Sequence, residues 1–254
     1  MEKNKILITM TLLVLTLLHV ACSSAESAAK YDAAMARWAK KGEYEDKLGG
    51  RFNVKVTLYT AEYIEALMRS EAERNLWTSS ELEDYKYNFL KGLSIDDNIA
   101  IHVELEEFGP TAHMAPFNEM VSLWVGSTKY SPTDYDQRFN LPLQGKRDGM
   151  LYFPRYSEKT GEPLLKRDTT LRLVFKGAVS PVLENRDVRF AWDVKAENAV
   201  LAASGTAVDR LEVDRLIRRM EKLAAEKADL ETQLEAKNRE MEDITSRIEE
   251  LQNK

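Results

Sequence analysis

The sequence predicts a mainly β protein with helices: an antiparallel β-sandwich-like domain with inserted helices, followed by a long C-terminal α-helix that forms a coiled coil. Short segments between residues 51 and 203 alternate apolar and polar residues, with Pro and Gly between them. From residue 213 onward, an apolar residue instead recurs every three and four positions. The chain has 254 residues, of which 44% are hydrophobic, which is sufficient for a core.

The N-terminal residues 1–21 have the pattern of a signal peptide. Lys3 and Lys5 precede an uncharged apolar run over residues 6–21, which is shorter than the roughly 20 residues a membrane-spanning helix requires. The only cysteine, Cys22, follows this run directly. Two fates of this segment need no modification of the cysteine. An ordinary signal peptide would be cleaved off and a soluble protein exported, or the segment would remain uncleaved as an anchor.

The segment around Cys22 resembles the lipobox of bacterial lipoproteins. Val20, Ala21 and Cys22 fit that pattern, whereas His19 stands where Leu is usual. The resemblance implies that Cys22 is lipidated and becomes the mature N-terminus, which would anchor the protein without a spanning helix. Ser23 after the cysteine implies an outer-membrane lipoprotein that faces the periplasm.

Residues 22–48 predict a membrane-proximal helical spacer, and residues 49–204 a β-rich globular domain. The spacer is Ala-rich and carries Tyr31, Met35 and Trp38 on one helical stripe, so we expect a helix that ends near Gly42. The domain begins with a strand over residues 51–60, where apolar and polar residues alternate.

Two helices are expected after this first strand, and further strands after them. Thr60 can cap a helix that runs to about Trp77, and Ser80 with Glu83 predicts a capping box for a second helix that ends at Gly92. Alternation then predicts strands near residues 98–107, 119–127, 149–154, 169–177, 187–195 and 198–203.

Residues 205–254 predict a coiled-coil helix. If Val213 is at heptad position a, the a and d positions that follow form a seam of twelve residues. Only Lys227 and Lys237 among these twelve are not apolar. A long helix with such a seam favours a homo-oligomer, with a hetero-partner or packing on its own domain as alternatives. The apolar seam residues are Val213, Leu216, Met220, Leu223, Leu230, Leu234, Met241, Ile244, Ile248 and Leu251.

Two segments, 129–148 and 155–168, gather aromatic and basic residues of the types enriched at interfaces. They predict a recognition loop for a small envelope ligand, with a self-packed loop as the alternative. Its residues are Tyr130, Tyr135, Arg138, Phe139, Arg147, Arg155 and Tyr156.

The sequence gives no sign of catalytic chemistry. One Cys and three His exclude an intrachain disulfide and a Cys/His zinc site, and His102 and His113 fit a strand and a loop without metal-ligand spacing. Nucleophile-elbow, P-loop and dinucleotide-binding motifs are missing. A net charge of −6 without a basic block argues against nucleic-acid binding. We therefore expect no cofactor, no metal and no enzymatic activity.

Together these features predict a non-enzymatic, lipid-anchored cell-envelope protein with a structural or assembly role through its coiled coil, whose β-domain recognises an envelope partner. The alternative is a periplasmic ligand-binding lipoprotein that uses the aromatic-basic loops. The order of acylated Cys, heptads and terminal Lys254 is similar in plan to the major murein lipoprotein, which implies peptidoglycan as a partner through Lys254. The long domain between anchor and helix departs from that plan.

Overall fold

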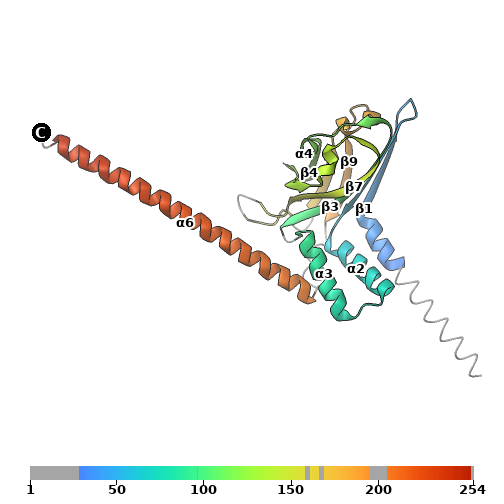
Figure 1. Ribbon diagram of the computed structural model, residues 1–254, viewed down its shortest axis with the longest axis horizontal. Helices are drawn as coiled ribbons and strands as arrows, with labels where there is room; N and C mark the ends of the chain where they lie inside the picture. The colour runs from blue at the N-terminus through green and yellow to red at the C-terminus, as the bar shows by residue number, and fades with distance from the viewer. Residues whose placement is uncertain (1–28, 96, 158–160, 166–168, 195–204, 253–254) are drawn as a thin grey trace, which may run out of the picture. The chain divides into compact units, whose positions relative to one another are not determined.

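The computed structural model describes residues 29–95, 97–157, 161–165, 169–194 and 205–252 (Figure 1). Cys22, the predicted signal peptide, the predicted strand 198–203 and Lys254 lie outside these residues. The chain divides into two compact units, Met1–Val208 and Asp209–Lys254, and each is considered by itself.

The first unit contains two antiparallel sheets. The first has the strand order β1 (Ala39–Glu45), β2 (Arg51–Leu58), β3 (Asn98–Ala112), β7 (Leu143–Pro154) and β6 (Asp134–Tyr135). The second has the order β5 (Thr128–Tyr130), β4 (Val121–Val125), β8 (Thr169–Phe175) and β9 (Val188–Val194). The fold class predicted from the alternation is confirmed.

One hydrophobic core lies between the two sheets. Val54 and Val56 of β2 and Val103 of β3 face it from the first sheet, and Leu173 and Phe190 face it from the second. The alternation of the sequence therefore separates a buried face from a more exposed outer face along strands such as β3 and β9. Short helical segments close this core: α4 (Phe117–Met120), η1 (Gln137–Asn140), η2 (Gly177–Val179) and η3 (Pro181–Leu183).

Helices α2 (Ala61–Asn75) and α3 (Ser79–Gly92) are inserted between the paired strands β2 and β3. They cover one end of the outer face of the first sheet, because Ala100 on that face is fully buried and the ring of Tyr59 stacks on Tyr63 of α2 and Phe89 of α3. The Thr60 cap of α2 is confirmed, since its side chain accepts a hydrogen bond from the backbone N–H of Tyr63.

Two expectations for local structure are wrong. Residues 29–38 are helical as predicted, but β1 begins at Ala39 and pairs with β2 along its whole length, so the helix does not reach Gly42. The predicted spacer therefore contributes a strand to the sandwich. The capping box of α3 uses Thr78 and Glu81 instead of Ser80 and Glu83, whereas its end at Gly92 is as predicted.

The described part of the second unit belongs to α6 (Gly205–Gln252), a single helix of 48 residues that begins shortly before the unit boundary. All ten apolar side chains of the predicted seam are exposed on it, with exposed fractions between 47% and 65%. The helix is therefore confirmed, and its pairing in a coiled coil stays a prediction.

Candidate functional site

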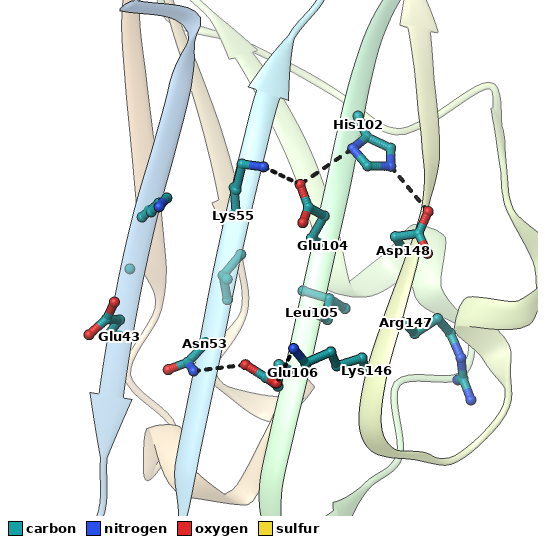
Figure 2. Close-up of a pocket in the computed structure, with 13 residues that line it drawn as sticks. Glu43, Asn53, Lys55, His102, Glu104, Leu105, Glu106, Lys146, Arg147 and Asp148 are labelled. Atoms are coloured by element: carbon teal, nitrogen blue, oxygen red, sulfur yellow. Dashed lines mark hydrogen bonds and ion pairs between the residues drawn. The ribbon is translucent and has the colours of Figure 1, made fainter. Parts of the chain in front are cut away.

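A shallow groove of about 490 Å³ lies on the outer face of the first sheet, beyond the end that α2 and α3 cover. Cross-strand register places its side chains in two rows. One row contains Lys41, Lys55, Glu104 and Asp148, and the other contains Glu43, Asn53, Glu106 and Lys146. Figure 2 shows these rows crossing β1, β2, β3 and β7.

The first row is joined by the ion pair of Lys55 with Glu104 and by contacts of the His102 ring with two carboxylates. Lys55 Nζ lies 2.5 Å from Glu104 Oε1. The same carboxylate oxygen lies 3.8 Å from His102 Nδ1. His102 Nε2 lies 3.3 Å from Asp148 Oδ2 (Figure 2). His102 is on the outer face, as the alternation predicts, and it connects carboxylates from two strands.

The second row centres on Glu106. Its carboxylate accepts a hydrogen bond of 3.1 Å from the Asn53 amide and lies 3.0 Å from Lys146 Nζ. The hydrogen bonds from Lys146 and Asn53 hold the pKa of Glu106 below its usual range. Both rows therefore carry charges of both signs that neutralise one another, which favours a polar contact surface over a site for a strongly charged ligand.

The aromatic side chains of the predicted recognition loop belong mainly to the fold itself. Phe139 is fully buried, and its ring stacks on Phe117 with centroids 4.6 Å apart. Phe139 is thus a core residue, which corrects its prediction as a surface contact. Tyr135 packs against the same core and exchanges hydrogen bonds with Asn140, and Tyr130 also packs on the core. Tyr156 forms an isolated bridge with Pro163.

The basic side chains of that loop hydrogen-bond to nearby carbonyl and carboxylate groups. Arg147 donates to the carbonyl oxygens of Arg138 and Leu141 at 2.8 and 2.7 Å, and it points away from the charged rows (Figure 2). Arg138 pairs with Asp136 at 2.6 Å, and Arg155 donates to the carbonyl oxygen of Asn98. These bonds tie the described part of the loop to the sandwich.

Glu107 is a polar residue of the core that sequence reasoning missed. It is 1% exposed, and neither carboxyl oxygen has a hydrogen-bond partner. Burial raises its pKa, and the nearby carboxylate of Asp46 adds to this effect, while the hydroxyl of Ser180 offsets part of it. The alternation contained the signal, because Glu107 has the same parity as Val103 and Leu105, which face the core.

The described residues contain no group of three or more His, Cys, Asp or Glu side chains placed to hold a metal ion. None of the helices in the described ranges is long and apolar enough to cross a membrane. Comparison with known protein families, curated proteins and solved structures finds no match to this chain. The apolar seam of α6 and the charged rows are therefore the surfaces from which a function can be argued.

Proposed function

We propose that this chain is a non-enzymatic, lipid-anchored protein of the cell envelope with a structural or assembly role. In this proposal α6 is the assembly element, Cys22 carries the lipid, and the β-domain recognises an envelope partner. The observation that carries the proposal is the apolar seam of α6, in which ten large side chains remain about half exposed.

Physical chemistry favours a partner for this seam. Full burial of one Leu, Ile or Met side chain contributes about 1.5–3 kcal/mol, so even partial burial of ten such side chains is a large driving force. The opposite faces of α6 carry ion pairs such as Lys222–Glu226 at 3.9 Å and Glu235–Arg239 at 3.8 Å, which keep those faces in water. Knobs-into-holes packing along the seam is the arrangement that fits both facts.

The sequence supports the anchor. A signal-peptide pattern ends at a single cysteine in a chain that has no second cysteine to pair with it. The β-domain offers the charged rows as its contact surface, whose interleaved Lys and Glu side chains suit a partner that carries both signs of charge.

The seam is tested with two matched double variants in the full chain. Leu223→Asp with Leu230→Asp places two charges in the seam, whereas Ala225→Asp with Thr232→Asp places the same charges on the outer face of the same turns. We expect the seam variant alone to shift the protein to a smaller complex on native gels of detergent-solubilised envelopes. Equal complexes for both variants and the unchanged chain would contradict an assembly role for α6.

The anchor is tested separately at Cys22. Metabolic labelling with an alkyne fatty acid is expected to mark the chain, and Cys22→Ser is expected to lose the label and to leave the membrane fraction. Cys22→Ser that stays in the membrane fraction would indicate an uncleaved anchor. An unlabelled, soluble native chain would indicate ordinary cleavage and export, and either outcome would remove the lipid from the proposal.

A further inference from the structure

We propose that α6 pairs with α6 of a second copy of this chain in antiparallel orientation. The two helices overlap over their full length, an arrangement called here the end-to-end register. In this register Gly205 of one copy is level with Gln252 of the other. The inference rests on the proposed function, because it specifies the partner and the geometry of the same seam.

A parallel pair in register would place like charges together. Lys227 would face Lys227 of the second copy, and Lys237 would face its own counterpart, so two layers of the seam would each hold two buried ammonium groups. At the flanking positions, Glu226 would face Glu231 of the second copy. The remaining flanking pairs from Arg219 to Gln252 contain no pair of opposite charges. Charge therefore disfavours the parallel arrangement.

The antiparallel end-to-end register separates these lysines. Position a of one helix then faces position d of the other, which places Lys227 opposite Leu230 and Lys237 opposite Met220. A single lysine in a layer can cover the apolar partner with its methylene groups and extend its ammonium group to water. The remaining layers between residues 213 and 244 are apolar on both sides, for example Leu223 opposite Leu234.

The same register brings Arg219 of one copy beside Glu240 of the other, and the symmetry of the pair repeats this contact. These two residues lie about 31 Å apart along a single helix, so they cannot meet within one chain. Glu240 already lies 2.6 Å from Lys237 of its own helix, and Arg219 would balance the remaining negative charge around it.

Neighbouring antiparallel registers are worse. Aligning Val213 with Leu251 would place Lys227 opposite Lys237 and would bring Arg219 near Arg247. A shift of one heptad in the opposite direction would leave residues 246–252, which include Ile248 and Leu251, without a helical partner. The end-to-end register has one cost, because Ile248 and Leu251 lie level with positions 209 and 206, which are polar.

Distances between spin labels test orientation and register together. The full chain with Cys22→Ser is labelled either at Ser246→Cys or at Ala228→Cys, both on the outer faces of α6, in detergent. Because position 246 of the second copy is level with position 211, we expect a distance of about 50 Å for label 246. Label 228 lies near the symmetry axis, so we expect about 20 Å there.

A distance of about 20 Å for both labels would mean a parallel pair and would overturn the inference. A monomeric mass with no coupling at either label would exclude a second copy as the partner. Neither result removes the proposed assembly role, which fails only if the seam and outer-face Asp variants form the same complexes in envelopes.

Charge reversal gives an independent readout. Arg219→Glu is expected to weaken self-association about tenfold, and Glu240→Arg in the same chain is expected to restore it. Arg218→Glu, at an outer position, is the control and is expected to change the association constant by less than about twofold. The antiparallel register would be contradicted if the double variant Arg219→Glu, Glu240→Arg associated still more weakly than Arg219→Glu alone.

Discussion

Glu107 shows how one residue can oppose the stability of the core that contains it. Its carboxyl group takes a position in β3 at which the strand otherwise carries Val or Leu, and it does so without a hydrogen-bond partner. A buried carboxyl of this kind remains protonated above its ordinary pH range, because ionisation would place an uncompensated charge in the core.

Because the pKa of Glu107 is raised, its contribution to the free energy of unfolding depends on pH. Below about pH 4 the carboxyl is protonated in the folded and unfolded chain, so it does not favour unfolding. As the pH rises through the range between the unfolded and the folded pKa, the unfolded chain ionises and the folded chain does not. Stability is therefore lost with rising pH in that range.

We expect Glu107→Gln to raise the free energy of unfolding relative to the unchanged chain by about 1–2 kcal/mol at pH 7.5, and by much less at pH 4.5. Urea denaturation followed by tryptophan fluorescence at both pH values measures this difference. Glu106→Gln is the control, because it removes a partly exposed carboxylate whose pKa is lowered and therefore cannot produce the same slope. An equal effect of Glu107→Gln at both pH values would contradict the buried carboxyl.

At the scale of the elements, a buried ion pair joins the two inserted helices. Lys86 of α3 is buried, and its Nζ lies 2.8 Å from Oε2 of Glu65 on α2. Glu65 also lies 2.8 Å from Arg69. Burial by itself would raise the pKa of Glu65, but the hydrogen bonds from Lys86 and Arg69 lower it below its usual range. The pair therefore stabilises the helices at neutral pH and is lost as acid protonates Glu65.

Glu65→Ala is expected to lower the free energy of unfolding by about 2 kcal/mol, since it leaves the ammonium group of Lys86 buried without its partner. Adding Lys86→Met should recover most of this loss, because an apolar side chain of similar length then replaces the charge. Glu71→Ala removes an exposed pair with Arg74 on the same helix and should cost less than about 0.5 kcal/mol. Thermal denaturation of the four chains distinguishes these cases.

The elements that could be predicted from the sequence are those determined by local patterns. The alternation in β2, the cap at Thr60 and the heptads of α6 are each contained within a few neighbouring residues. β1 could not be predicted in this way, because its strand conformation depends on pairing with β2 while its preceding residues have a helical pattern. The charged rows depend on the register of four strands, which no local pattern determines.

The whole molecule should unfold in two separate steps. All four Trp residues, at positions 38, 77, 124 and 192, belong to the first unit, whereas α6 contains a large share of the helix. Tryptophan fluorescence therefore reports the first unit alone, whereas circular dichroism at 222 nm reports α6 together with the helices of the first unit. If α6 is stabilised by association, its stability depends on protein concentration and that of the sandwich does not.

We expect a fluorescence midpoint that is independent of protein concentration and a dichroism midpoint that rises by several degrees for a hundredfold increase in concentration. The seam variant Leu223→Asp with Leu230→Asp should lower only the dichroism midpoint. Two midpoints that move together in every chain would show that the units do not unfold independently.

The insertion of α2 and α3 between two directly paired strands has a consequence for the ancestry and engineering of this fold. Tyr59, directly after β2, donates its backbone N–H to the carbonyl oxygen of Ala100 in β3, so the chain leaves the sheet and returns to it at adjacent points. The side chains that these helices bury, such as Ile64, Met68 and Leu90, do not belong to the core between the sheets. A short hairpin turn could thus replace the helical pair with the sandwich core retained, which makes this connection the place where the domain can gain or lose a module.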